Sequence, residues 1–417
     1  MGDSGFFHFQ QKKEIGGIGI LNVTLCNRGH PEYGAATIPL PIPDEEYAHC
    51  MELLEALEIG SVTGHDCYVD QITDAPPSLD MLEGTMINVD ELDFLARSLD
   101  RYTDEELAKF QCMTATREHW DMQTLINLSF SCEQATVITD FSKLEEAGRS
   151  HYMTMHGGGV PVEEYNQLNG VGIARSLIAD GGGRITPYGV VFENAMRIEP
   201  VYDGHSFPPY SDKPYLMEFT IETDREGELT FFLPQPEKRL ERLLERAEIY
   251  TAEQLNIRTW RFDLPDAVAD CLDVPHESLD ALNSLCAAVS RMDQTELQAL
   301  SAVVQYTQPE YAFQIRRLAE NLDLFDYVEG VQTAEEYGRY LIQESGHYEF
   351  DENLEAYYDY DKCGREQMES ESGGYTQEGY VSYHGTMSID ELMMEDPAEQ
   401  EEAPQREQGM QMGGLSC

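Results

Sequence analysis

Two glycine-rich stretches come closest to known catalytic loops in residue type and spacing. His156-Gly157-Gly158-Gly159 is similar to the loop whose backbone N–H groups form the oxyanion hole of esterases. That chemistry also needs a nucleophilic serine in a G-x-S-x-G turn, and the sequence contains no such turn. Gly170-Val171-Gly172 is too short for a dinucleotide-binding loop, which also needs a preceding strand and an acidic residue about twenty positions later. We therefore interpret these glycines as turn residues.

No other pattern in the sequence predicts a reaction. There is no phosphate-binding G-x-x-x-x-G-K-[ST] loop, no H-E-x-x-H pair and no C-x-x-C pair. His65, His119 and His205 have no neighbours at the spacing of metal ligands. We expect no catalytic residue, no metal and no cofactor, so the protein is predicted not to be an enzyme. An enzyme with its site in the glycine-rich stretch is a third and weaker alternative.

Negative charge is the strongest signal in the sequence. Its 78 acidic and 27 basic residues give a formal net charge of −51. Direct binding of nucleic acid is excluded, because phosphates demand a basic surface. Self-repulsion on this scale destabilises a folded chain, so we expect the acids to face a strongly basic partner. Duplex DNA carries one charge per about 1.7 Å of axis, so this charge equals that of roughly 25 base pairs.

Three predicted helices, over residues 44–57, 88–99 and 103–114, have an apolar stripe inside and carboxylates outside. Asn88 with Glu91, and Thr103 with Glu106, are predicted to form capping boxes at the starts of the last two. We predict that carboxylates on these helices and on later acidic segments bind the partner as phosphates of DNA would, although a solvated face is the simpler interpretation of any single helix. The candidates are Glu45, Glu46, Glu52, Glu55, Asp90, Glu91, Asp104, Glu105, Glu145, Glu146, Glu335, Glu336, Asp351, Glu352, Asp359 and Asp361.

Cysteine usage and hydropathy predict the cellular location. The nine cysteines are odd in number and form no closely spaced pair, which indicates reduced structural thiols. The N-terminus lacks a secretion signal, and no apolar stretch approaches the roughly 18 residues of a membrane span. We expect a cytoplasmic protein without a membrane partner.

The predicted fold class is α+β, in an elongated multi-domain chain of small sheet-plus-helix units and acidic helical units. The chain is also predicted to contain an internal tandem repeat and a β-rich insertion. The predicted units are an αβ unit (1–78), an acidic helical unit (79–154), a glycine-rich β insertion (155–228), a second αβ unit (229–275), a second acidic helical unit (276–345), an acidic helix with a hairpin (346–385) and a disordered acidic tail (386–417).

The repeat is visible in short matches at nearly constant spacing. Glu335-Glu336-Tyr337-Gly338-Arg339 repeats Glu145-Glu146-Ala147-Gly148-Arg149 at an offset of 190 residues. Leu40-Pro41-Ile42-Pro43 recurs as Leu233-Pro234-Gln235-Pro236 at an offset of 193 residues. We interpret the chain as two copies of one module of roughly 110 residues. The insertion and the C-terminal hairpin unit are expected to have no counterpart in the other copy.

The C-terminal part resembles a known family, the ArdA-type antirestriction proteins. The resemblance is carried by Tyr358-Asp359-Tyr360-Asp361-Lys362-Cys363-Gly364-Arg365-Glu366, followed by Gly374-Tyr375-Thr376 and Gly379-Tyr380-Val381. Residues 282–339 are similar to the acidic helical middle of that family, and residues 40–152 resemble it less fully. The positions that match the family motif are Gly338, Arg339, Gly364 and Arg365.

The resemblance implies a non-enzymatic DNA mimic that occupies the DNA-binding groove of type I restriction-modification enzymes. It also implies a bacterial protein from a mobile genetic element, and either a homodimer or an in-chain pseudo-dimer of the two copies. The alternative function, from another class, is an acidic adaptor or regulator that binds a different basic protein.

Overall fold

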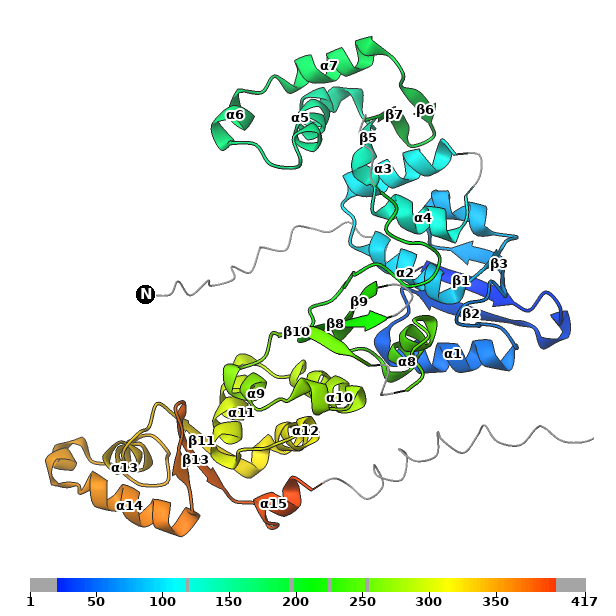
Figure 1. Cartoon of the computed structure of the whole chain (residues 1–417). Coiled ribbons are helices and arrows are strands. Elements are labelled where there is room, and N and C mark those ends of the chain that lie inside the picture. The colour runs from blue at the N-terminus through cyan, green and yellow to red at the C-terminus, as the bar shows by residue number, and fades with distance from the viewer. Residues whose placement is uncertain (1–20, 118–119, 195–198, 224–226, 252–254, 395–417) are drawn as a thin grey trace, which may run out of the picture. The chain divides into compact units, whose positions relative to one another are not determined.

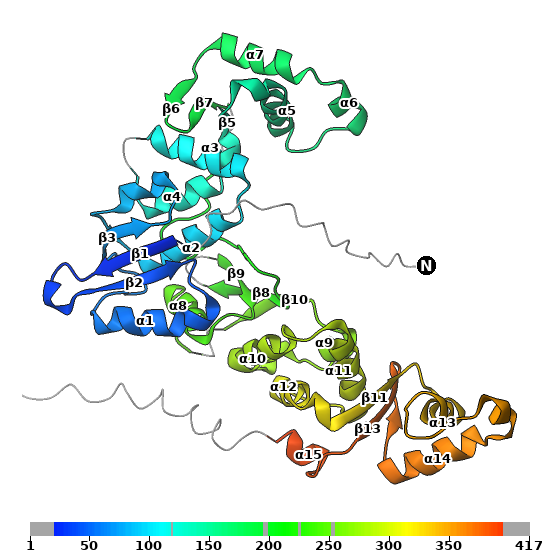
Figure 2. The same ribbon diagram turned by 180° about the vertical axis from the view of Figure 1, so that it is seen from behind.

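The computed structural model describes residues 21–117, 120–194, 199–223, 227–251 and 255–394. The chain divides into two compact units, Met1–Asp212 with Lys238–Tyr250, and Lys213–Glu237 with Thr251–Cys417. Each unit combines small antiparallel sheets with helices, so the predicted α+β class is confirmed (Figures 1 and 2).

Unit 1 contains a four-stranded sheet in the order β2-β1-β3-β4 and a three-stranded sheet in the order β5-β7-β6. Its elements are β1 (Leu21–Cys26), β2 (Ala35–Leu40), α1 (Tyr47–Ala56), β3 (Cys67–Thr73), β4 (Met86–Ile87), α2 (Val89–Asp100), α3 (Asp104–Ala115), α4 (Met122–Ser129), β5 (Ala135–Ile138), α5 (Leu144–Met155), α6 (Val162–Gln167), α7 (Gly170–Asp180), β6 (Arg184–Thr186), β7 (Gly189–Glu193) and α8 (Glu237–Arg246).

The core of unit 1 follows the alternation of its first strand. Leu21, Val23 and Leu25 of β1 are fully buried, and they belong to one apolar cluster with residues of α1, α2, α3 and α4. The start of α3 is a capping box: Thr103 Oγ1 accepts from Glu106 N, and the Glu106 carboxylate accepts from Thr103 N at 2.8 Å. The capping box predicted for Thr103 is therefore confirmed.

Unit 2 contains the sheets β10-β8-β9 and β11-β13-β12. Its elements are β8 (Met217–Thr223), β9 (Gly227–Leu233), β10 (Ile257–Phe262), α9 (Asp266–Asp270), α10 (Leu279–Val289), α11 (Gln294–Thr307), α12 (Ala312–Glu320), β11 (Phe325–Glu329), α13 (Ala334–Gln343), α14 (Tyr360–Glu371), β12 (Gly374–Tyr375), β13 (Gly379–Tyr383) and α15 (Ile389–Leu392). Helices α10, α11 and α12 pack through buried leucine, valine and isoleucine side chains.

The order and pairing of elements recur along the chain at the sequence offset of 190 residues. Strand β5 pairs with β7 from Ala135↔Glu193, and β11 pairs with β13 from Phe325↔Tyr383. The turn that joins β6 to β7 and the turn that joins β12 to β13 contain the same hydrogen bond. Thr186 Oγ1 donates to Gly189 O at 2.9 Å, and Thr376 Oγ1 donates to Gly379 O at 3.0 Å. Both units thus contain a helix pair followed by a hairpin.

The region over residues 155–228 differs from the predicted β-rich insertion. Its first half holds the helices α6 and α7, and its hairpin β6–β7 has a counterpart in β12–β13. The glycines had been interpreted as turn residues, and Gly157 and Gly158 do have positive φ angles after the end of α5. Gly170 instead begins α7, where the side chain of Asn169 accepts a hydrogen bond from Gly172 N.

Glycines allow the backbones of paired helices to touch in both units. A Cβ on Gly148 of α5 would lie 1.9 Å from the carbonyl oxygen of Gly170 in α7. In unit 2, a Cβ on Gly338 of α13 would lie 1.9 Å from Tyr360 O, and one on Gly364 of α14 would lie 1.9 Å from Ala334 O. Two of the four predicted family-motif residues are therefore contact glycines.

We expect Gly338→Ala and Gly148→Ala each to lower the free energy of unfolding by about 1–3 kcal/mol, because a methyl group must displace backbone atoms. Denaturant unfolding followed by circular dichroism measures the change. Gly159→Ala is the control, since no atom lies within 4 Å of its Cβ position and its φ is not positive. An unchanged midpoint for Gly338→Ala would contradict the close helix contact.

The end of the described chain is more ordered than predicted. Residues 386–394 belong to the predicted disordered tail, yet α15 begins with a capping box between Ser388 and Glu391. Leu392 and Met393 are buried, and Leu392 O accepts from Arg317 Nε at 2.7 Å. Residues 386–394 therefore include a helical turn that packs on unit 2 through these two side chains. Residues 395–417 and 1–20 lie outside the described residues.

Candidate partner-binding surface

Helices α13 and α14 lie side by side in unit 2, and an acidic segment joins them (Figures 1 and 2). Residues 334–371 hold twelve acidic and three basic side chains, a net charge of −9. Six of the predicted carboxylates belong to this stretch or its connecting segment. Glu335, Glu336, Asp351, Glu352 and Asp359 are exposed, and Asp361 is half-buried.

Helix starts hold several of these carboxylates in place. Asp359 accepts from Lys362 N at 3.1 Å and caps α14, and Asp351 accepts from Asn353 N at 2.9 Å. The carboxylate of Glu336 accepts from Gln332 N at 2.8 Å, and this hydrogen bond together with Thr333 lowers the pKa of Glu336. Negative charge is favoured at helix N-termini, so these hydrogen bonds hold the three side chains in place.

The basic residues of the helix pair are engaged in ion pairs. Arg339 contacts Glu335 at 3.6 Å and Glu355 at 3.1 Å, and its guanidinium lies 4.5 Å from the centre of the Tyr360 ring. The other motif arginine, Arg365, pairs with Asp361. Four exposed carboxylates have neither an ion-pair nor a hydrogen-bond partner among the described residues: Glu344, Glu349, Glu352 and Glu369. We call these four the unpaired carboxylates.

The corresponding helix pair of unit 1 is much less acidic. Residues 144–181 hold five acidic and two basic side chains, a net charge of −3. Glu145 pairs with Arg149 at 2.7 Å and accepts from Val171 N at 2.9 Å, and both contacts lower the pKa of Glu145. Glu146 is exposed. Helix pairs with the same backbone contact therefore differ in the charge they present.

Unit 1 has further exposed carboxylates on its other helices. Asp104 and Glu105 lie in the first turn of α3, where Glu105 pairs with Lys109 at 3.2 Å. The predicted residues in and just before α1 are all exposed: Glu45, Glu46, Glu52 and Glu55. Their role in binding stays a prediction.

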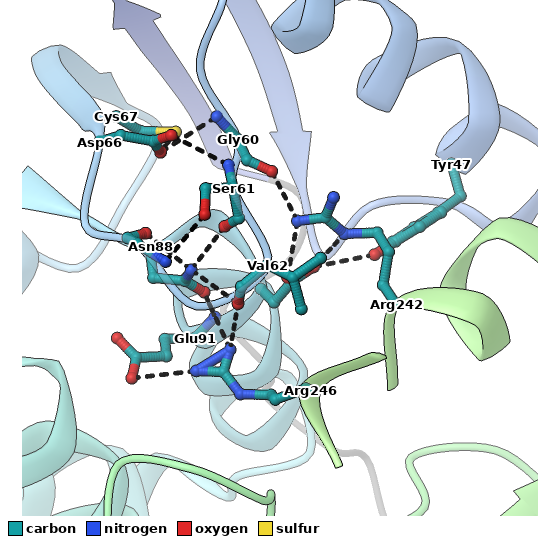
Figure 3. Close-up of polar contacts among 12 residues, drawn as sticks. Tyr47, Gly60, Ser61, Val62, Asp66, Cys67, Asn88, Glu91, Arg242 and Arg246 are labelled. Carbon is teal, nitrogen blue, oxygen red and sulfur yellow. Dashed lines mark hydrogen bonds and ion pairs between the residues drawn. The ribbon is translucent and has the colours of Figure 1, made fainter. Parts of the chain in front are cut away.

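Asp90 and Glu91 of α2 are not on the surface, which corrects the prediction for this helix. They are 8% and 1% exposed. Glu91 lies beside Arg246 of α8 (Figure 3). Arg242 binds Asp90 through two nitrogens, with Nε–Oδ1 and Nη2–Oδ2 distances of 3.0 and 2.7 Å. Arg246 Nη2 lies 3.3 Å from Glu91 Oε1. Both carboxylates are occupied inside unit 1, so they are not available to a partner.

Each guanidinium nitrogen of Arg246 finds a partner. Its Nη1 donates to Val62 O at 2.8 Å and to Asn88 Oδ1 at 3.2 Å, and its Nη2 donates to Tyr202 Oη at 2.9 Å. Asn88 also donates to three backbone carbonyls of the 61–64 turn (Figure 3). The capping box predicted for Asn88 is therefore only half present. Asn88 accepts from Glu91 N, but the Glu91 carboxylate is directed to Arg246 and Tyr202.

Sequence reasoning missed this cluster although it contained a signal. Arg239, Arg242 and Arg246 are spaced three and four residues apart, which places them on one helix face. Arg239 has the same kind of contacts: its Nη1 lies 2.7 Å from Asp44, and its guanidinium lies over the Tyr47 ring at 4.4 Å.

Comparison with protein families matches residues 226–382, the segment that holds the acidic helix pair and its hairpin. The family is ArdA, the antirestriction proteins. The ArdA match covers less than half of the chain, and it includes all four predicted motif residues. The predicted resemblance is confirmed for this segment, and it supports an antirestriction protein. No curated protein matches the sequence.

The ArdA match assigns no reaction, because the family is non-catalytic. Among the described residues, no three histidine, cysteine, aspartate or glutamate side chains are grouped so that they could hold a metal ion. The helices in the described part of the chain are all too short or too polar to cross a membrane. The likeness of residues 40–152 to ArdA stays a prediction, since the match does not reach them.

Proposed function

We propose that this protein is an antirestriction protein that mimics DNA and occupies the DNA-binding groove of a type I restriction-modification enzyme. The observation that carries the proposal is the net charge of −9 on residues 334–371, which comprise α13, α14 and the segment that joins them, within the ArdA-matched segment. Carboxylates fixed on touching helices stand in for phosphates, and a basic groove that binds them releases the same counterions as on DNA.

We also propose that the two copies act together as an in-chain pseudo-dimer. The proposal is supported by the matching order and strand pairing of the elements at the offset of 190 residues. Because the two helix pairs differ in charge, the copies contribute unequally, and unit 2 supplies the larger share of the mimicry.

The test is competition for DNA. A purified type I restriction-modification enzyme is held on labelled duplex DNA at about 50 mM salt, and the full chain is titrated in. We expect displacement of the DNA, because both ligands offer dense negative charge to the same groove. Six to ten phosphate-like contacts predict that the affinity falls by about 10³- to 10⁵-fold between 50 and 200 mM salt.

One outcome of this assay would contradict the proposal, and a separate mass measurement tests the pseudo-dimer. No displacement at micromolar protein and low salt contradicts DNA mimicry and favours the acidic adaptor. Light scattering gives the mass of the inhibitor: 47.2 kDa supports the in-chain pseudo-dimer, and twice that mass supports a homodimer.

A further inference from the structure

A groove of about 1090 Å³ lies in unit 2 between α9, α11 and the turn that joins β12 to β13. Its walls carry six glutamines and four carboxylates, and no lysine, arginine or histidine is among the residues that line it. The carboxylates are those of Asp263, Asp266, Asp270 and Glu378. The groove therefore presents hydrogen-bond acceptors and negative charge, with no cation of its own.

Hydrogen bonds fix the hairpin wall of this groove to its helical wall. Gln377 N donates to Gln305 Oε1 at 2.8 Å, and Ser301 Oγ lies 3.3 Å from Glu378 Oε1. The turn is also tied to the residues before α13, since Gln332 Nε2 donates to Thr376 O at 2.9 Å. The groove is thus formed before any ligand enters, which lowers the entropic cost of binding.

The same place in unit 1 is packed. At the offset of 190 residues, Glu378 corresponds to Tyr188. Tyr188 is half-buried and packs against the apolar core of unit 1. The segment Pro77–Leu82 contacts α3 there, with Leu79 and Leu82 buried. Unit 2 has a carboxylate and an open groove where unit 1 has an aromatic ring in its core.

We infer that this groove receives an arginine- or lysine-bearing segment of the restriction-modification enzyme, an inference that rests on the proposed function. Charge complementarity selects the occupant: guanidinium and ammonium groups offer only donors, and the groove offers carboxylate and amide acceptors. The chain contains an example of this chemistry in unit 1, where α8 places Arg242 on Asp90 through two hydrogen bonds. A segment that enters the groove would be recognised by its shape, in addition to the attraction of the helix pair's negative charge.

A bulky side chain that fills the groove tests the inference without changing the charge of the protein. Gln298 of α11 lines the groove, and Gln298→Trp fills it, whereas Gln298→Ala leaves it open. In the DNA competition assay, we expect Gln298→Trp to need at least tenfold more protein than the wild type for half-displacement. Gln298→Ala is expected to stay within about twofold of the wild type. Equal displacement by the two folded variants overturns the inference.

A second pair of variants covers the case in which the tryptophan disturbs folding. Asp266→Asn with Asp270→Asn removes two charges from the groove, and Glu310→Gln with Asp323→Asn removes two exposed charges elsewhere in unit 2. A larger loss of displacement from the groove pair supports the inference, and equal losses overturn it. If the wild-type chain itself displaces no DNA, the proposed function fails, so the two failures are distinguishable.

Discussion

A variant that neutralises the unpaired carboxylates of unit 2 is expected to need roughly 10- to 100-fold more protein to displace DNA from a type I enzyme. The substitutions are Glu344→Gln, Glu349→Gln, Glu352→Gln and Glu369→Gln. Each removes one phosphate-like contact, so the salt dependence of displacement should fall by about one logarithmic slope unit per residue. None of the four is paired among the described residues, so folding should be unaffected. Competition titrations at several salt concentrations measure both quantities.

The matched control removes the same charge from exposed positions outside the helix pair. Its substitutions are Glu310→Gln, Asp323→Asn, Asp326→Asn and Glu329→Gln. We expect a change within about threefold, because long-range charge effects are screened over the roughly 8 Å Debye length of physiological salt. Equal losses from the two variants would show that total charge, and not this surface, drives binding. A single change such as Glu146→Gln should be nearly silent, since one exposed charge contributes little.

Replacing Arg246, which pairs with the buried carboxylate of Glu91, should reduce stability more than the other substitutions proposed here. Arg246→Met leaves Glu91 buried without its guanidinium, and breaking such a pair costs about 3–5 kcal/mol of unfolding free energy. Denaturant unfolding of the full chain measures the loss. Lys238→Met is the control on the same helix. Lys238 is half-exposed and pairs with Glu241, so we expect a loss below about 1 kcal/mol.

A double variant separates charge from packing. Adding Glu91→Gln to Arg246→Met removes the unpaired charge while the amide still accepts from Tyr202. We expect the double variant to recover part of the lost stability, because the penalty comes mainly from the uncompensated carboxylate. If the single and double variants unfold alike, Arg246 acts through its packing on Phe207 instead.

Local features of this fold were predictable from sequence because their causes are local. The capping box at Thr103 needs only residues three positions apart, and the hairpin of β1 and β2 follows from alternating apolar residues around a glycine turn. Five of the six predicted carboxylates in residues 334–371 are exposed as expected, and Asp361 is half-buried.

The predictions that were wrong depend on contacts between residues that are far apart in the sequence. Asp90 on an amphipathic helix is indistinguishable in sequence from a solvated acid, and the arginine that buries it lies 152 residues away. The glycines after residue 155 predicted turns, but Gly170 is needed where two helices touch, a contact decided by its distance from Gly148 in space. The groove of unit 2 is lined by Glu378 at the position where unit 1 has Tyr188. Only a residue-by-residue comparison of the copies reveals that difference.

Helix α8 has a consequence for how this polypeptide can be divided. It lies in unit 1, although the strands before and after it, β9 and β10, lie in unit 2. The chain therefore passes between the units three times, after residues 212, 237 and 250. A gene truncated after the first passage would encode a unit 1 whose Asp90 and Glu91 lack their arginines. If the chain consists of two copies as we propose, a recombination event that deletes one copy also removes a structural part of the other.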